Sequence, residues 1–336
     1  MYYLLRPLLF RLDPETAHGL TLKLLRLAGI FPPSRWLLEA LYAVPQLPTR
    51  VFGLTFRNPV GLAAGYDKDA LALRGLAALG FGHLEIGTVT PLPQAGNPKP
   101  RIFRLVEDEA IINRMGFPGQ GAISVARRLT SSPAHRRPAV LGVNLGKNRD
   151  TPLEEAAADY LALLRIFAPL ADYLVINVSS PNTVGLRRLQ GRGMLEELLS
   201  ALRRERAACK QQPPILVKLA PDMEDDELDD ALAAITDQDM DGVIVTNTTL
   251  GRDGLHSPLA AESGGLSGRP LGIPSETVLG KVLKRLDGRL PVVSAGGIMC
   301  PADAKRRLEL GAALVQVYTG LVYAGPGLVR EIVRGL

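Results

Sequence analysis

The sequence predicts a (β/α)8 TIM barrel with a small N-terminal helical extension. Eight short apolar runs follow residue 58, and most are separated by segments of helical periodicity. Eight strands alternating with helices over about 280 residues suit a barrel whose usual length is about 250 residues. A doubly wound sheet is the alternative. It usually has fewer strands and a glycine-rich first turn, for which GLAAG at 61–65 is a weak match.

The eight predicted strands are placed by their apolar residues. They span 59–64, 83–87, 140–145, 173–178, 215–219, 242–247, 292–295 and 314–318. A short extended pair at 51–58 precedes them. The connection between the second and third predicted strands is long, and its segment 99–113 is expected to form an inserted hairpin over the barrel mouth.

The composition fits one large globular domain with a small appendage. The chain has 336 residues, 46% hydrophobic and 22% charged. Cys209 and Cys300 provide neither a disulfide framework nor metal-ligand spacing, which indicates a reducing compartment. The net charge of +5 and the pI of about 9.3 are compatible with anionic ligands, nucleic acid or an anionic membrane, and equally with ordinary surface charge.

Residues 1–45 differ from the rest of the chain. Asp13 as N-cap and Pro14 at the first helical position predict a helix that stops at Gly29, and a second short helix is expected at 34–42. Two apolar helices with basic flanks are typical of a hairpin on a membrane surface, or of a helical pair packed on the main domain. No segment approaches the roughly 20 apolar residues that span a bilayer, and no signal-peptide cleavage pattern is evident.

The carboxyl ends of the predicted strands are polar and should converge on one face of the barrel. They carry amides, hydroxyls and two lysines, Lys68 and Lys218, and apart from Asp67 they carry few carboxylates. None of the four histidines lies at such an end: His18, His83, His135 and His256. We therefore expect no metal site and no carboxylate pair. The pattern favours a planar heterocycle with lysine near developing negative charge, although a structural ion pair is the alternative for Lys218.

Glycine marks the last two strand ends, at 295–297 and 318–320, and the loop 264–268. Loops after strands seven and eight usually bind phosphate in such barrels, so a phosphorylated ligand is predicted. The stretch 172–182, DYLVINVSSPN, places Ser180 at a polar strand end. Without a histidine partner its hydroxyl is a poor nucleophile, which leaves a proton relay through Thr183 or water, or turn chemistry around Pro181.

Several motifs in this chain resemble those of the dihydroorotate dehydrogenase family over nearly its whole length. They are AAGYDKD, EIGTVTP, INRMGF, GVNLGKN, NVSSPNT, VKLAPD, TNTT, GGLSGRP, AGGI and VQVYTG. The N-terminal extension resembles that of the class 2 branch, which is bacterial, membrane-associated and quinone-reducing. Class 1 enzymes lack the extension and use cysteine as the base, where this chain has Ser180.

The resemblance implies oxidation of (S)-dihydroorotate to orotate in the fourth step of pyrimidine (UMP) biosynthesis. One FMN per chain would accept the hydride from C6, and a membrane quinone would be the final electron acceptor. Ser180 would take the proton from C5, Thr183 and water would relay it, and Phe117 would shield it from bulk water. Residues 1–45 would form the membrane and quinone-access domain, and residues 46–336 the FMN-binding catalytic barrel.

The resemblance also assigns site residues by matching motifs. Catalytic residues would be Ser180, Thr183, Phe117 and Lys218. FMN would contact Ala64, Gly65, Tyr66, Asp67, Lys68, Thr88, Asn144, Asn177, Lys218, Thr246, Gly268, Gly297, Tyr318 and Thr319. Substrate would contact Lys68, Asn113, Arg114, Met115, Gly116, Phe117, Asn177, Asn182, Asn247 and Thr248. The quinone would pass near His18, Arg104 and Tyr318. Tyr66 departs from the family pattern, where a smaller or apolar residue is expected.

Two other functions fit parts of the pattern. One is an FMN barrel reductase acting on a dihydropyrimidine or on tRNA dihydrouridine, disfavoured by dispersed charge and by the serine base. The other is a flavin-binding membrane protein without catalysis, disfavoured by the complete set of polar residues at the strand ends. We expect a monomer, attached peripherally to the cytoplasmic side of the inner membrane, with no nucleic-acid partner.

Overall fold

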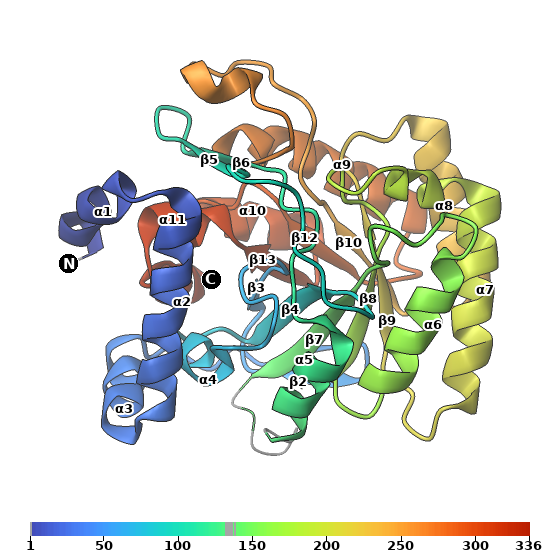
Figure 1. The fold of residues 1–336 in the computed structure, drawn as a ribbon, viewed down its shortest axis with the longest axis horizontal. Helices are drawn as coiled ribbons and strands as arrows, with labels where there is room; N and C mark the ends of the chain where they lie inside the picture. Colours follow the sequence, from blue (N-terminus) through green and yellow to red (C-terminus); the bar gives the residue numbers. More distant parts are fainter. Residues whose placement is uncertain (1, 132–136, 138) are drawn as a thin grey trace.

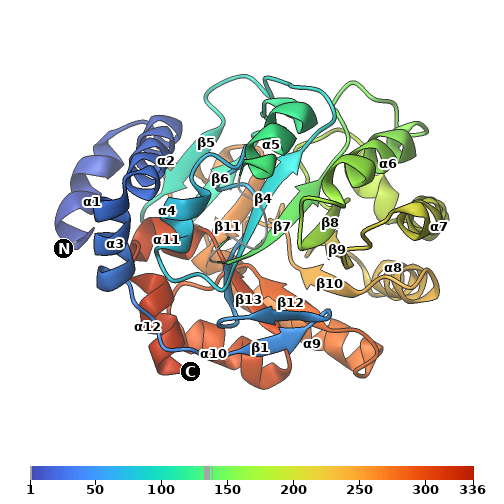
Figure 2. The ribbon, with the colours of Figure 1, turned by 90° about the horizontal axis from the view of Figure 1, so that it is seen from below.

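A closed barrel of eight parallel strands forms the centre of the molecule (Figures 1 and 2). The computed structural model describes residues 2–131, 137 and 139–336, so His135 lies outside the described residues. Around the barrel the strands are β3 (Val60–Leu62), β4 (His83–Val89), β7 (Val140–Leu145), β8 (Tyr173–Asn177), β9 (Ile215–Leu219), β10 (Gly242–Val245), β12 (Val292–Ala295) and β13 (Leu314–Val317). The predicted (β/α)8 barrel is confirmed.

Each predicted apolar run overlaps one barrel strand, and the differences lie at the ends, as in β4, which continues to Val89. β8 stops at Asn177 and β10 at Val245, one and two residues before the predicted ends at 178 and 247. Beyond β10, the N–H groups of Thr246 and Asn247 still donate to the carbonyls of Ala295 and Leu219 on the neighbouring strands. Ser180, Thr246 and Asn247, which follow these two ends, all line the mouth of the barrel. The strand residues are almost all buried, as expected for parallel strands covered on both faces.

Helices cover the outside of the barrel, and their apolar faces pack on the strands in two large core clusters. These are α4 (Leu73–Ala77), α5 (Gly121–Thr130), α6 (Ala156–Phe167), α7 (Arg192–Ala208), α8 (Asp225–Asp237), α9 (Gly272–Leu286), α10 (Pro301–Leu310), α11 (Thr319–Ala324) and α12 (Leu328–Gly335). Short 3-10 turns are η2 (Leu186–Gln190), η3 (Pro258–Ala261) and η4 (Arg269–Leu271).

A small hairpin closes the amino-terminal end of the barrel. Its strands, β1 (Thr49–Val51) and β2 (Leu54–Phe56), pair antiparallel, which confirms the predicted extended pair. Phe56 is fully buried and packs edge-on against the ring of His83, with 5.4 Å between ring centroids. Together with Tyr173 these side chains fill the base of the barrel, so the polar strand ends at the opposite face remain available for ligands.

A three-stranded sheet covers part of the barrel mouth. β5 (Ile102–Leu105) and β6 (Ala110–Asn113) form the predicted inserted hairpin. β11 (Gly265–Gly268) pairs with β6, whereas the sequence predicts a flexible loop at 264–268. The close approach explains the difference: a side chain at Gly268, whose φ is +100°, would overlap the backbone of Glu109. The glycine at 268 therefore allows β11 to pair closely with β6, and the segment forms part of the sheet.

Three helices, α1 (Tyr2–Arg11), α2 (Pro14–Ile30) and α3 (Pro32–Leu41), lie together beside α4 and α11 in both views. α2 begins as predicted, because the Asp13 carboxylate accepts the Thr16 N–H at 2.9 Å. α1 was not predicted, since Pro7 interrupts its sequence. Its contacts to the barrel stabilise it: the Tyr2 hydroxyl donates to the carbonyl of Val322 at 2.5 Å.

Candidate active site

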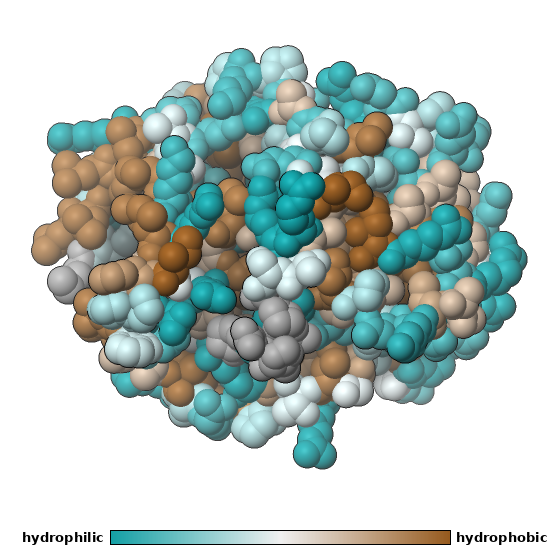
Figure 3. Space-filling model, turned by 60° about the horizontal axis from the view of Figure 1, so that its bottom comes forward, coloured by the Kyte–Doolittle hydropathy of each residue, from teal (hydrophilic) through white to brown (hydrophobic). Residues whose placement is uncertain are grey.

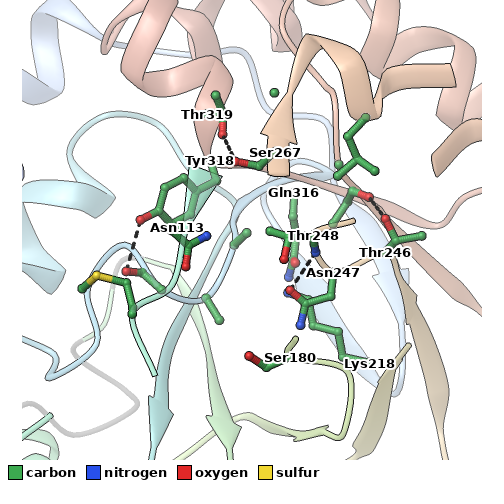
Figure 4. A pocket seen from close by; sticks show the side chains of 18 of the residues that line it. Asn113, Ser180, Lys218, Thr246, Asn247, Thr248, Ser267, Gln316, Tyr318 and Thr319 are labelled. Atoms are coloured by element: carbon green, nitrogen blue, oxygen red, sulfur yellow. Dashed lines mark hydrogen bonds between the residues drawn. The ribbon is translucent and has the colours of Figure 1, made fainter. Parts of the chain in front are cut away.

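The polar strand ends converge on one cavity at the carboxyl-terminal face, which we call the mouth cavity (Figure 4). Its walls include most of the predicted cofactor and substrate residues. The predicted residues that line it are Ala64, Gly65, Lys68, Thr88, Asn113, Met115, Gly116, Phe117, Asn177, Ser180, Asn182, Lys218, Thr246, Asn247, Thr248, Gly268, Gly297, Tyr318 and Thr319. Tyr318 and Asn113 lie on one side in Figure 4, opposite Lys218, Asn247 and Thr246.

Side-chain amides on neighbouring strands hold one another in fixed orientations. Asn177 Nδ2 donates to the Thr88 hydroxyl at 2.8 Å, and that hydroxyl donates to Asn144 Oδ1 at 2.6 Å. Asn247 Nδ2 donates to the Ser179 hydroxyl at 2.9 Å. A buried, connected network of this kind fixes which amide groups face a ligand as donors and which as acceptors. It suits a flat heterocycle with alternating hydrogen-bonding groups.

Ser180 sits in the turn that follows β8 and is 5% exposed. Its hydroxyl oxygen accepts the backbone N–H of Asn182 at 3.2 Å, so the turn chemistry considered for this serine is present. Arg187 anchors the surrounding backbone: its guanidinium donates to the Ser179 carbonyl at 3.1 Å and to the Thr248 carbonyl at 2.9 Å. The Ser180 hydroxyl nonetheless lines the mouth cavity and is available to a bound ligand.

Lys218 combines the two roles considered for it. Its ammonium lies 3.7 Å from the buried carboxylate of Glu85, so a structural ion pair exists. Glu85 also accepts Asn144 Nδ2 at 2.9 Å and Gln316 Nε2 at 2.6 Å. Such partners satisfy a charge pair that would otherwise be costly to bury. Lys218 also lines the mouth cavity, where its charge can meet negative charge on a ligand.

Lys68 places a second cation in the mouth cavity. Its ammonium donates to the Gly65 carbonyl at 2.7 Å. Burial lowers the pKa of Lys68 to about 8. A ligand carboxylate beside this ammonium would favour its charged form and would form a charge-assisted hydrogen bond.

Glycines form one end of the mouth cavity. Gly268, Gly296 and Gly297 have φ values of +100°, +109° and +69°, and all three line the cavity. A side chain on Gly297 would overlap the backbone of Gly272 at the start of α9. Backbone N–H groups are therefore exposed at close quarters beside a helix N-terminus, which is an arrangement that suits a phosphate group.

Five of the residues predicted for catalysis, cofactor or substrate do not line the mouth cavity. Asn144 lies behind Thr88, and Tyr66 lies in the wall of a second cavity. The Asp67 carboxylate accepts the backbone N–H groups of 71 and 72 at 2.7 and 2.8 Å, so it shapes the first loop. Arg114 pairs with Glu262 at 2.6 Å. Thr183, three residues after Ser180, is buried.

The second cavity, which we call the side cavity, lies between the N-terminal helices and the barrel. It is lined mostly by apolar residues of α1, α2, β5 and α11. His18, Arg104 and Tyr318, the predicted quinone residues, all line it. The His18 ring packs edge-on against Tyr66 at 4.9 Å, and burial lowers the pKa of His18 to about 4, so its ring is neutral at neutral pH.

The two cavities share a wall. Four residues line both of them: Asn113, Met115, Ser267 and Tyr318. The Ser267 and Thr319 hydroxyls are 2.8 Å apart and hold the glycine strand β11 against α11 (Figure 4). A single layer of side chains therefore separates a polar cavity in the barrel mouth from an apolar cavity under the helices.

Some lining residues were absent from the contacts assigned by the motifs. Ala63, Ala295, Gly296 and Gly320 lie at predicted strand ends, and Ser267 lies in the predicted loop 264–268. The lining residues that were not predicted as site residues are Leu271, Ile298, Met299 and Gln316. Glu85, the partner of Lys218, was also missed. Glu85 and Gln316 each place a polar side chain inside an otherwise apolar predicted strand, and that signal could have identified both. Ile298 and Met299 gave no such signal, because apolar residues after a strand are common.

Comparisons with known proteins agree with this geometry. A family model described as dihydroorotate dehydrogenase matches residues 46–336. A protein of Roseiflexus sp. (strain RS-1) named dihydroorotate dehydrogenase (quinone) is 52% identical over 338 residues, covering 100% of this chain and 93% of the relative. One of the same name from Thermus thermophilus is 53% identical over 330 residues, covering 98% and 94%.

One solved structure matches nearly the whole fold of this chain. The crystal structure of DHODH from Eimeria tenella in complex with ferulenol has a TM-score of 0.89 and 40% sequence identity, and the match covers 98% of this chain and 93% of that one. The similarity thus includes the N-terminal helices as well as the barrel. By motifs, fold and relatives together, this chain belongs to the dihydroorotate dehydrogenase family.

Proposed function

We propose that this protein oxidises (S)-dihydroorotate to orotate, with FMN as hydride acceptor and a membrane quinone as final electron acceptor. The observation that carries the proposal is the wall shared by the mouth cavity and the side cavity. Because of this shared wall, a single layer of side chains separates a polar site for one substrate from an apolar site for the other. That arrangement suits two substrates that react in turn with one bound cofactor.

The mouth cavity fits FMN. When bound, FMN supplies a two-electron acceptor that takes a hydride from dihydroorotate and is reoxidised by the quinone. Gly268, Gly296 and Gly297 would hold its phosphate, and Lys218 its ring edge, where negative charge develops. Among the described residues, the buried atom Gln316 Oε1 has no hydrogen-bond partner. An N–H donor of a ligand would satisfy this acceptor.

Ser180 would act as the base that takes the proton from C5 of dihydroorotate. A serine hydroxyl is a weak base, so the proton must pass onward as it arrives, and Thr183 with water is the proposed route. Phe117, at the edge of the mouth cavity, would limit exchange with bulk water. Asn113 and Asn182, whose amides are joined at 3.2 Å, would bind the pyrimidine ring.

Lys68 would bind the carboxylate that distinguishes dihydroorotate from uncharged dihydropyrimidines. Among the described residues its half-buried ammonium has one hydrogen-bond partner, the Gly65 carbonyl, which leaves two of its three N–H donors for a ligand. A desolvated ammonium gains most from an anionic partner. The remaining proposed contacts to FMN and substrate are those assigned above from the motifs.

The chain divides into two functional parts in this proposal. Residues 46–336 hold flavin and dihydroorotate, and residues 1–45 form the entrance for the quinone. Arg104 supports the entrance: it donates to the Leu12 carbonyl at 2.5 Å and lies 4.7 Å from the centre of the Phe10 ring. His18, Arg104 and Tyr318 would meet the quinone head, and the apolar walls would surround its tail.

The N-terminal helices would attach the protein to a membrane surface. Their outer face carries large exposed apolar side chains, which form the hydrophobic area at the left of Figure 3. They include Tyr3, Leu4, Leu5, Leu8, Leu20, Leu27, Ile30, Phe31, Trp36, Leu37 and Leu41. No helix in the described part of the chain is long and apolar enough to cross a bilayer. A monomer resting peripherally on the cytoplasmic side of the inner membrane fits this surface.

Orotate formation by the purified protein tests the proposal. We expect orotate to accumulate from dihydroorotate with a soluble ubiquinone analogue and not with NAD. A variant lacking residues 1–45 should still form orotate with an artificial dye as acceptor, but should lose its activity with quinone. Orotate formation coupled to NAD, or unchanged quinone kinetics after the deletion, would contradict the assignment of acceptor and entrance.

A further inference from the structure

Arg307, in α10, is a fully buried charge that the proposed reaction does not use. It is 1% exposed and is among the largest fully buried side chains in the described residues. Its Nη2 donates to the Gly272 carbonyl at 2.6 Å, to the Ser275 hydroxyl at 2.9 Å and to the Gly296 carbonyl at 3.4 Å. Glu276, half-buried, lies 3.3 Å from its Nε. A buried guanidinium is costly unless it has such partners.

One of these partners, Gly296, lines the glycine end of the mouth cavity, and Gly272 lies directly against Gly297 there. Gly296 follows β12 and lines the cavity, and Gly272 begins α9. Ser275 joins the two from the same side, since its hydroxyl is 2.8 Å from the Gly296 carbonyl and 3.1 Å from the Gly272 carbonyl. Arg307 and Ser275 therefore tie the loop after β12 to the first turn of α9, where their backbones are in contact.

The direction of these bonds matters for the cavity. A trans peptide is planar, so its C=O and the following N–H point in opposite directions. When the Gly296 carbonyl turns toward Arg307, the Gly297 N–H turns away from it. In the same way, the hydrogen bond from Arg307 to the Gly272 carbonyl fixes the direction of the N–H group of Ile273. The guanidinium thus orients backbone donors and adds a positive charge behind them.

We infer that Arg307 is a positioning residue for the phosphate group of the flavin: it orients the N–H donors of the 296–297 loop and the start of α9, and its charge supports the bound anion from behind. This inference rests on the proposed function, because it requires FMN in the mouth cavity. It predicts an effect that depends on the phosphate, whereas a residue that only stabilised the barrel would affect all flavins alike.

The test compares FMN with riboflavin, which lacks the phosphate. Dissociation constants for both are measured by flavin fluorescence on deflavinated wild type, Arg307→Met and Arg307→Lys. In Arg307→Met we expect FMN to bind at least about tenfold more weakly, a factor that corresponds to 1.4 kcal/mol. Riboflavin affinity should change by less than about threefold, and Arg307→Lys should restore part of the FMN preference.

Arg57→Met is the matched control. The Arg57 guanidinium also donates to two backbone carbonyls, those of Phe81 at 2.8 Å and Ala77 at 2.7 Å, but it lines neither cavity. Its loss should leave the ratio of FMN to riboflavin affinity unchanged. If Arg307→Met does not fold, Arg307→Lys and Ser275→Ala provide the same comparison of FMN with riboflavin. Each weakens the hydrogen bonds between the loop after β12 and the start of α9 without leaving a large cavity.

Equal losses of FMN and riboflavin affinity in the Arg307 variants would overturn the inference and leave Arg307 a structural residue. Unchanged FMN affinity would overturn it as well. In both cases a wild type that prefers FMN to riboflavin would leave the proposed function intact. A wild type that bound neither flavin would remove the proposed function, and this inference with it.

Discussion

Replacing Ser180 with alanine separates the proposed chemistry from the fold. The hydroxyl accepts one hydrogen bond, from the Asn182 N–H at 3.2 Å, so its removal should cost about 0.5–1.5 kcal/mol of stability. A general base contributes about 10²–10⁴-fold to a rate, which corresponds to about 3–5 kcal/mol of barrier. Ser180→Ala should therefore bind FMN and fold normally, while flavin reduction by dihydroorotate slows by about 10²–10⁴-fold.

Anaerobic stopped-flow absorbance of the flavin measures this step without the quinone. Ser257→Ala is the matched control, because Ser257 is also 5% exposed and accepts the backbone N–H two residues on, from Leu259 at 3.4 Å. The control should reduce its flavin within about threefold of the wild-type rate, since Ser257 lines neither cavity. Flavin reduction in Ser180→Ala at a rate close to that of the control would refute the role of Ser180 as base.

Three further predictions concern binding. Because the pKa of Lys68 is lowered to about 8, its ammonium loses its proton as the pH rises through that value, and kcat/KM for dihydroorotate should fall there. Lys68→Met should raise KM and abolish this pH dependence. Exchanging Leu4 and Leu27, 79% and 64% exposed, for aspartate should weaken binding to anionic vesicles at least about tenfold in a sedimentation assay. Gly297→Ala should lower the flavin content, because its side chain would overlap the start of α9, whereas Gly280→Ala, which meets no atom within 4 Å, should not.

Each of these predictions has a result that would count against it. A constant kcat/KM between pH 7 and pH 9 would mean that the charge of Lys68 does not bind the substrate. Ile123, 62% exposed on α5, provides the control for the vesicle assay: if Ile123→Asp weakened binding as much as the double exchange did, the N-terminal helices would not be the attachment surface. Full flavin content in Gly297→Ala would show that the glycine end of the mouth cavity tolerates a side chain.

The barrel could be predicted from sequence because parallel strands buried on both faces are short apolar runs with polar ends. The runs at 140–145, 215–219 and 292–295 coincide with β7, β9 and β12. α1 could not be predicted, since Pro7 argues against a helix. That helix is held by contacts between residues more than 300 positions apart, such as the bond from Tyr2 to Val322, and no local pattern encodes them.

The candidate site was predictable to a similar degree. Lys218 and Asn177 stand at strand ends, so their convergence follows from the fold alone. Asn113, at the end of the hairpin, and Met115, just after it, were recognised from their motif, because the path of a long insertion is not set by periodicity. Arg307 was missed, since an arginine in the polar helix α10 gives no sign in the sequence that it turns inward.

One measurement tests the central claim most directly: the flavin absorbance of the purified protein under anaerobic conditions, first with dihydroorotate and then with an electron acceptor. We predict that dihydroorotate bleaches the flavin, that a soluble quinone restores its absorbance, and that NAD does not. A protein that holds FMN but is not bleached by dihydroorotate would contradict the proposed reaction. If NAD restored the flavin absorbance, the electron acceptor would not be a quinone bound in the side cavity.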